Sequence, residues 1–239
     1  MYSPPEKAGK TAGKPGAATT VPVLERHMLV WLDDAGWIAA QRTEEPQHKA
    51  AFRLWQIQSW PVVVRRADAD AAPDEICLGL PLPPDEDSGH KVRISLRAHA
   101  AHIKKSAPAM ALASVLRSSP STWRAQLAAL QRDAAGMHLR AYGSLAMEAI
   151  TELPYVSETS DVDILFHPTS RRQLEDGVAM LSRHAALLPL DGEIVFPGGA
   201  AVSWKEWRMA IANPAKVIVK ELGVVRLADT ASLLALLEP

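Results

Sequence analysis

The chain has 239 residues, of which 48% are hydrophobic and 22% charged, a balance typical of a globular protein with one large or two small domains. Its formal net charge of −1 excludes steering of a polyanion by the overall field, so phosphate binding requires a local patch. The single cysteine, Cys77, excludes an intrachain disulfide and a cysteine-based zinc site, and it indicates a reducing, cytoplasmic compartment.

The first twenty residues, MYSPPEKAGKTAGKPGAATT, consist mainly of Pro, Gly, Ala, Lys and Thr. They contain no apolar core, so they predict a disordered tail over residues 1–20 rather than a secretory signal. No apolar stretch of about 18 residues follows, and we therefore expect no membrane span.

Residues 21–115 predict a small N-terminal α+β module. Segments rich in apolar and β-branched residues, bounded by polar loops, favour strands, and one Trp-containing segment has helical spacing. The predicted elements are a strand within 23–32, a helix over 46–60, a strand over 61–66, a strand from residue 75 and, after a Pro-rich turn, a strand over 91–96.

Residues 116–239 predict a second domain, in which strands and helices alternate. The predicted elements are a helix in 121–137, a strand over 138–142, a helix from 143 through 150, a strand over 161–166, an amphipathic helix over 169–188, strands over 193–196, 201–204, 216–222 and 224–227, and a helix over about 229–237. The whole chain therefore predicts an α+β fold, with a mixed sheet and flanking helices in the second domain.

Two carboxylates, Asp161 and Asp163, occur within the apolar strand segment SDVDILF. Residues i and i+2 of a strand project from the same face, with Cα atoms about 6.6 Å apart. Such a pair repels itself, and no cation stands beside it in the sequence. A divalent cation relieves the repulsion, and magnesium prefers carboxylate oxygens together with substrate phosphates. The pattern predicts a magnesium site at both aspartates.

Gly143 and Ser144 lie between the strand over 138–142 and the following helix. A helix N-terminus offers free N–H groups and a positive dipole end to a phosphate, and glycine permits close approach to the backbone. We therefore predict that Gly143 and Ser144 bind substrate phosphate. The alternative is that Ser144 is a plain helix cap.

A third carboxylate is expected on the next strand, and Asp191 and Glu193 share the required parity in LPLDGEIVF. We favour Glu193 as a metal ligand because it lies further into the strand. Asp191 is a second candidate ligand, or else belongs to a turn with Gly192.

Four cations are candidates for binding the phosphate chain. Arg65 and Arg66 end a strand of the first module, whereas Lys216 and Lys220 share one face of a late strand. The alternative for each is a solvated surface charge. No Lys/Arg cluster with interleaved aromatic residues occurs, so we expect no nucleic-acid partner.

The order strand, Gly-Ser, helix and Asp-x-Asp resembles the nucleotidyltransferase superfamily, whose fold is that of DNA polymerase beta. Sixteen residues separate Ser144 from Asp161, somewhat more than is usual in that superfamily. Most of residues 23–230 resembles one family within it, the phosphoribosyl-dephospho-CoA transferases, also called holo-acyl-carrier-protein synthases of malonate decarboxylase. The segments that carry this resemblance are RHMLVWL, WPVVVRR, LGLPLPP, YGSLAMEAIT, SDVDILFHP, DGEIVFPGGAAVSWKEW and VIVKELGVVRL.

The resemblance implies a reaction as well as a fold. The donor is 2′-(5″-triphosphoribosyl)-3′-dephospho-CoA, and a serine of the acyl carrier protein subunit attacks its α-phosphate, with release of diphosphate. The family's catalytic pair falls on Asp161 and Asp163. Two alternatives are a small-molecule nucleotidyltransferase that uses a nucleoside triphosphate, and a non-catalytic antitoxin of the same fold.

Overall fold

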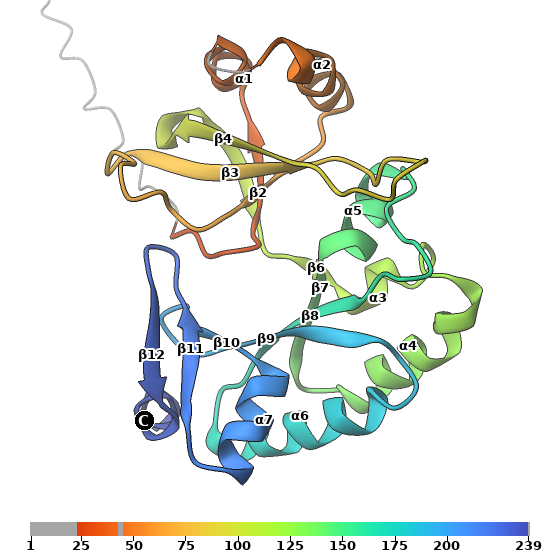
Figure 1. The fold of residues 1–239 in the computed structure, drawn as a ribbon, viewed down its shortest axis with the longest axis vertical. Coiled ribbons are helices and arrows are strands. Elements are labelled where there is room, and N and C mark those ends of the chain that lie inside the picture. The colour runs from red at the N-terminus through yellow and green to blue at the C-terminus, as the bar shows by residue number, and fades with distance from the viewer. Residues whose placement is uncertain (1–22, 43–44, 239) are drawn as a thin grey trace, which may run out of the picture.

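The computed structural model describes residues 23–42 and 45–238, so the tail expected over residues 1–20 lies outside the described part. The molecule has two lobes, each built on its own sheet (Figure 1). The N-terminal sheet has five strands in the order β4-β3-β2-β1-β5, and the second sheet has seven in the order β12-β11-β10-β9-β8-β7-β6. Within the described residues, no helix is long and apolar enough to cross a membrane.

The strands of the N-terminal lobe pair antiparallel throughout. Its elements are β1 (Leu29–Leu32), α1 (Asp34–Arg42), η1 (Pro46–His48), α2 (Lys49–Gln58), β2 (Val62–Val64), β3 (Glu75–Pro81), β4 (Arg93–His99), η2 (Ala100–His102) and β5 (Ile103–Ala107). Helices α1 and α2 cover one face of the sheet, where Trp37, Phe52 and Trp55 are buried against the strands (Figure 1). The predicted helix over 46–60 and the four predicted strands are confirmed, whereas α1 and β5 were not predicted.

The second lobe is a mixed sheet with flanking helices, as predicted. Its elements are β6 (Met110–Ala111), α3 (Leu112–Val115), α4 (Ser121–Asp133), β7 (His138–Tyr142), α5 (Gly143–Thr151), β8 (Val162–His167), α6 (Arg171–His184), β9 (Leu190–Val195), β10 (Ala201–Ser203), α7 (Trp204–Ala212), β11 (Lys216–Lys220), β12 (Val225–Asp229), α8 (Thr230–Leu234) and η3 (Ala235–Leu237). Strands β8 and β9 run parallel, and the other neighbouring pairs run antiparallel.

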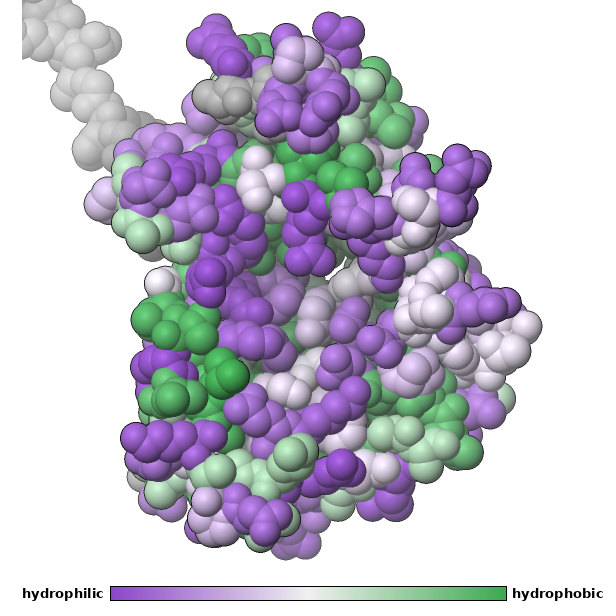
Figure 2. All heavy atoms as spheres, in the orientation of Figure 1, coloured by the Kyte–Doolittle hydropathy of each residue, from purple (hydrophilic) through white to green (hydrophobic). Residues whose placement is uncertain are grey.

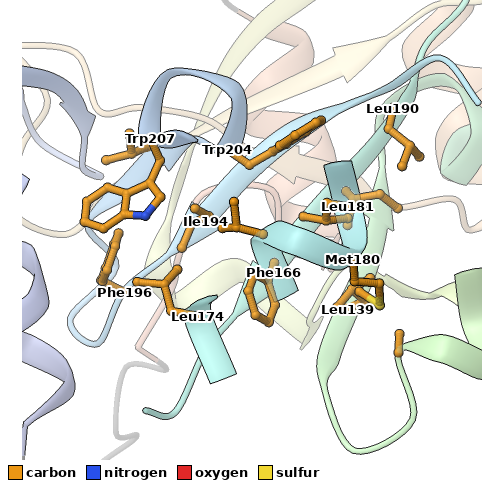
Figure 3. Packing of buried hydrophobic residues seen from close by; sticks show 14 of the residues in the cluster. Leu139, Phe166, Leu174, Met180, Leu181, Leu190, Ile194, Phe196, Trp204 and Trp207 are labelled. Carbon is orange, nitrogen blue, oxygen red and sulfur yellow. The ribbon is translucent and has the colours of Figure 1, made fainter. Parts of the chain in front are cut away.

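One face of the second sheet is buried under helices α4, α6 and α7 (Figure 1). Phe166 of β8 and Leu181 of α6 belong to this core, together with Trp204 and Trp207 of α7 (Figure 3). The amphipathic helix predicted over 169–188 is confirmed as α6. Helix α7 was not predicted, because it begins directly at the end of β10 with no intervening turn.

The boundary between the lobes falls between β5 and β6, that is, after Ala107 and before Met110. We expected it at 115/116. Strand β6 pairs with β7, and α3 packs into the second core, so both elements belong to the second lobe. The Ala- and Leu-rich sequence around them gives no sign of the change.

Helix α5 and the loop that follows it join the two lobes. Met147 and Tyr155 come from the second half of the chain, but they are buried in the N-terminal core. The Tyr155 hydroxyl also donates a hydrogen bond of 2.8 Å to the Pro81 carbonyl. The extended loop between α5 and β8 therefore packs against the N-terminal lobe and fixes the edge of the space between the two sheets.

Candidate active site

The turn from β7 into α5 brings a helix N-terminus against a carboxylate. Gly143 begins α5 with a φ of +68°, in the left-handed region that favours glycine. A Cβ atom added at this position would overlap the carboxylate of Asp163 on the neighbouring strand. Glycine at position 143 therefore lets Asp163 lie at the mouth of α5, so one ligand can contact the carboxylate and the helix N-terminus together.

Asp163 lies among other acidic groups. It alternates along β8 with Val162 and Ile164, which point into the core, as the sequence predicts. Burial raises the pKa of Asp163 to about 6, and the carboxylates of Asp191 and Asp161 add to the rise. Asp161 lies one residue before β8 and is exposed. Three carboxylates thus act on one another at the open face of the sheet, where a cation would relieve their repulsion.

The register of the parallel strands decides which acid of β9 lies beside Asp163. Asp163 is paired with Asp191, whereas Glu193 is paired with Leu165, two residues further along. Asp191 lies inside β9 beside Gly192, so a turn at this point is excluded. Its carboxylate is half-exposed, and Lys205 of α7 lies 3.5 Å from it.

Glu193 is already surrounded by basic groups. It is 4% exposed, and Arg26 donates hydrogen bonds of 3.0 and 3.2 Å to its two oxygens. Lys220 Nζ lies 3.0 Å away and His27 Nε2 3.4 Å away. Burial alone would raise the pKa of Glu193, but His27 and Arg26 outweigh burial and hold it well below its usual range. The geometry therefore favours Asp191, rather than Glu193, as the third carboxylate of the site.

The residues suit a metal that is completed by substrate. Within the described part of the chain, no three His, Cys, Asp or Glu side chains come together as a metal cage. Magnesium, however, is usually held by one or two carboxylates plus substrate phosphates. Asp163 supplies such a ligand beside the N-terminus of α5, and Asp161 lies two residues before it. The face that carries Asp161, Asp163 and Asp191, here called the acidic face, therefore fits magnesium bound together with a phosphate chain.

Ser144 does not cap its helix. Tyr142 occupies the N-cap position, and no side chain forms a capping hydrogen bond there. Instead, the Ser144 hydroxyl accepts a hydrogen bond of 3.1 Å from Lys91 Nζ, which also lies 3.4 Å from the Ser160 hydroxyl. Lys91 belongs to the segment between β3 and β4, so a cation of the N-terminal lobe contacts the first turn of α5.

A cleft of about 610 Å³ lies between the lobes, and Asp163 and the first residues of α5, Gly143 and Ser144, line it. Hydrophilic side chains gather where the two lobes meet (Figure 2). The side chains that line the cleft and carry a charge or a ring nitrogen are Arg26, His27, Arg65, Arg66, Lys91, Arg93 and Asp163. The N-terminal lobe thus contributes most of the positive charge, and the second lobe contributes the carboxylate.

The predicted substrate-binding cations have different surroundings. Arg65 lines the cleft, but its guanidinium forms two hydrogen bonds to Asp68, of 2.5 and 2.7 Å. Arg66 lines the cleft and is exposed. Lys220 binds Glu193, and Lys216 lies at the opposite end of β11, away from the cleft.

Sequence reasoning missed Lys91 and Arg93. Both follow a Pro-rich turn in the segment GHKVR, and they have the same i, i+2 spacing as the aspartate pair. In a strand, that spacing predicts two cations on one face; in the structure Arg93 begins β4 and Lys91 lies just before it. The spacing was a usable signal, but the facing carboxylates come from another lobe and could not be located from the sequence.

The mixed sheet, the Gly-Ser turn into α5 and the carboxylates of β8 and β9 are consistent with an α+β nucleotidyltransferase-like fold. Residues 25–109 match the family described as the phosphoribosyl-dephospho-CoA transferase MdcG N-terminal domain, and residues 111–231 match its C-terminal domain. The chain therefore belongs to the phosphoribosyl-dephospho-CoA transferase family, and it is a transferase.

Curated relatives agree with this assignment. A phosphoribosyl-dephospho-CoA transferase from Xanthomonas campestris pv. campestris (strain 8004) is 38% identical over 212 residues, which cover 87% of this chain and 95% of the relative. A protein of the same name from Bradyrhizobium diazoefficiens is 32% identical over 209 residues, covering 85% of this chain and 89% of the relative. No solved structure matches the chain.

Proposed function

We propose that this protein transfers the phosphoribosyl-dephospho-CoA group from 2′-(5″-triphosphoribosyl)-3′-dephospho-CoA to a serine of the acyl carrier protein of malonate decarboxylase. The serine hydroxyl gives up its proton to solvent, its oxygen bonds to the α-phosphorus, the bond from that phosphorus to the bridging oxygen breaks, and diphosphate leaves. The observation that carries the reaction type is the position of Asp163, which lies against the N-terminus of α5 and beside Asp191.

Each part of the cleft has a place in this reaction. The first-turn N–H groups of α5 have no partner within the helix and point toward a bound phosphate. Leu29 and Val63 from the N-terminal lobe, together with Met110 and Met147, give the cleft apolar walls. Such walls suit the adenine ring and the pantetheine chain of the donor, while the polar groups fix the orientation of the reacting phosphate.

Magnesium is the proposed cofactor, with Asp161 and Asp163 as its ligands and Asp191 beside them. When bound, it would neutralise phosphate charge and lower the pKa of the attacking hydroxyl. The pKa of Asp163 is about 6, so this carboxyl is mostly ionised at neutral pH, as a ligand must be. The proposed location is the cytoplasm, in line with the free, buried thiol of Cys77.

The direct test is the intact mass of the carrier protein. The protein is incubated with apo carrier protein, magnesium and the triphosphoribosyl donor, and in a parallel reaction with ATP in place of the donor. A gain that matches the prosthetic group supports the proposal. Transfer of a nucleotide from ATP alone would instead favour a small-molecule nucleotidyltransferase, and no transfer from either donor would favour a non-catalytic role.

A further inference from the structure

The cations of the cleft fall into two groups. Arg26 is bound to Glu193, and Arg65 is bound to Asp68, so both are compensated within the protein. Lys91, Arg93 and Arg66, in contrast, form no ion pair with any described residue, although all three line the same cleft. Of these three, Lys91 contacts Ser144 in the first turn of α5, and Arg93 lies two residues from Lys91.

The β3–β4 hairpin directs these two cations toward the second lobe. Arg93 is the first residue of β4, and Lys91 lies two positions earlier, in the segment that leads into the strand; both side chains line the cleft. The stem of Arg93 lies over Gly79 of β3, where an added Cβ would stand 3.2 Å from Arg93 Cδ. The absence of a side chain at position 79 thus leaves room for Arg93 to reach along the sheet face into the cleft.

Both cations act on the acidic face without pairing with it. Lys91 and Arg93 each lower the pKa of Asp163, against the larger effects of burial, Asp191 and Asp161. The nearest partners of Lys91 are the neutral hydroxyls of Ser144 and Ser160, which do not cancel its charge. Two uncompensated cations on one wall of the cleft and the uncompensated Asp163 carboxylate on the other suit an anion that bridges them through a metal.

We propose that Lys91 and Arg93 are the binding site for the β- and γ-phosphates of the donor, the part that leaves as diphosphate. The inference rests on the proposed function. The carboxylates and α5 hold the reacting α-phosphate, and the N-terminal lobe holds the leaving group. As the bond to the α-phosphorus breaks, its electron pair moves to the diphosphate oxygen, and the two cations stabilise that charge. Without donor, Lys91 bonds to the two serine hydroxyls.

The test uses magnesium tripolyphosphate and dephospho-CoA as separate probes, with binding measured by calorimetry on the full chain. Lys91→Met and Arg93→Met are each expected to weaken tripolyphosphate binding about tenfold or more, as for loss of one charge-assisted contact. Dephospho-CoA binding should change less than about twofold. Lys104→Met is the matched control, because Lys104 is an exposed lysine of β5 outside the cleft.

Transfer kinetics give a second readout. Because the site holds the leaving group, Lys91→Met and Arg93→Met should each lower kcat and weaken product inhibition by diphosphate. Lys91→Arg keeps the positive charge and should therefore lower kcat less, and weaken the inhibition less, than Lys91→Met. Unchanged tripolyphosphate binding in the double variant, with normal transfer, would overturn this inference and leave the proposed function standing. Equal loss of tripolyphosphate and dephospho-CoA binding would also overturn it. Loss of tripolyphosphate binding alone, in a protein that modifies no carrier, would uphold the phosphate site and reject the proposed function.

Discussion

Asp163 and Glu193 are acidic side chains on neighbouring strands of one sheet face, and their surroundings are opposite. Glu193 is contacted by Arg26, Lys220 and His27, and its pKa is held well below the usual range. Asp163 forms no ion pair with a described residue, and burial with two nearby carboxylates raises its pKa to about 6.

The difference shows how one sheet face serves two purposes. The acid whose charge is balanced by the protein fastens the N-terminal segment to the second sheet, since Arg26 and Glu193 come from different lobes. Asp163, whose charge no described basic side chain balances, is available to a cation that arrives with the substrate. Strand alternation places Asp163 and Glu193 on the same face of the sheet. Their roles differ because basic side chains surround Glu193 and not Asp163.

The largest effect is expected from Asp163→Asn. Loss of a metal ligand at the reacting phosphate should lower carrier modification by about 10³-fold or more. Asp161→Asn is expected to act in the same direction. The measurement is the initial rate of carrier modification by intact mass, with Asp176→Asn on the exposed face of α6 as a control that keeps full activity. More than a few per cent of residual activity in Asp163→Asn would contradict its proposed role.

Removal of the compensated acid should have its main effect on stability. Glu193→Gln leaves Arg26 without its buried partner and should lower the free energy of unfolding by about 3 kcal/mol at pH 7, at the low end for a buried pair because Lys220 is 42% exposed. The remaining folded protein should still bind magnesium tripolyphosphate. Normal stability together with lost metal binding would show that Glu193, rather than Asp191, is the third ligand.

The stability difference between wild type and Glu193→Gln should depend on pH. A folded-state pKa below the ordinary value of 4.5 contributes stability above pH 4.5, and that contribution is lost as the pH falls toward the folded pKa. Urea unfolding at pH 7 and at pH 3.5 should therefore show a smaller difference at the lower pH. A difference that grows on acidification would mean that the cations do not stabilise the Glu193 carboxylate.

The close approach at the mouth of α5 is tested by a pair of glycines. Gly143→Ala forces a non-glycine residue into positive φ and pushes a methyl group against Asp163, which should cost about 2–3 kcal/mol and most of the activity. Gly136 also has positive φ, at +80°, but an added Cβ meets nothing within 4 Å. Gly136→Ala should therefore cost about 1 kcal/mol and leave activity intact. Equal effects of both substitutions would remove the argument for a tight contact.

The smallest effect concerns the contribution of Asp163 to the stability of the folded protein. The pKa of Asp163 is raised from 3.8 to about 6 in the folded protein. The protonated carboxyl therefore contributes stability below pH 3.8, and this contribution is lost as the pH rises through about 6. Asp163→Asn should therefore raise Tm by about 2–4 °C at pH 8 and leave it unchanged near pH 3.5. Magnesium with tripolyphosphate should reduce the difference in Tm between Asp163→Asn and wild type at pH 8, since this ligand stabilises only the wild-type site. A lower Tm for the variant at pH 8 would argue against repulsion at Asp163.

The local part of the site was predictable from sequence. The strand over 138–142, the turn at Gly143 and the helix that follows are set by neighbouring residues, and they occur where the pattern predicted them. The outward projection of Asp163 follows from strand alternation with the core residues Val162 and Ile164. Each of these features depends on contacts within about ten residues.

The remaining features depend on contacts that the sequence does not encode locally. The choice between Asp191 and Glu193 needed the register of β8 against β9 and the position of Arg26. Lys216 was chosen for its strand face, and it lies at the opposite end of β11 from Lys220, outside the residues that line the cleft. These differences arise because strand parity gives the side of a sheet and not the position along it.

The central claim is that the face carrying Asp161 and Asp163 holds a metal together with the donor's phosphates. Manganese is a suitable replacement for magnesium, and its anomalous scattering locates it in crystals grown with the donor. We expect a peak in direct contact with the carboxylates of Asp161 and Asp163 and with phosphate oxygens in front of α5. A peak at Glu193, or donor phosphates bound away from α5 with no metal at Asp163, would contradict the account.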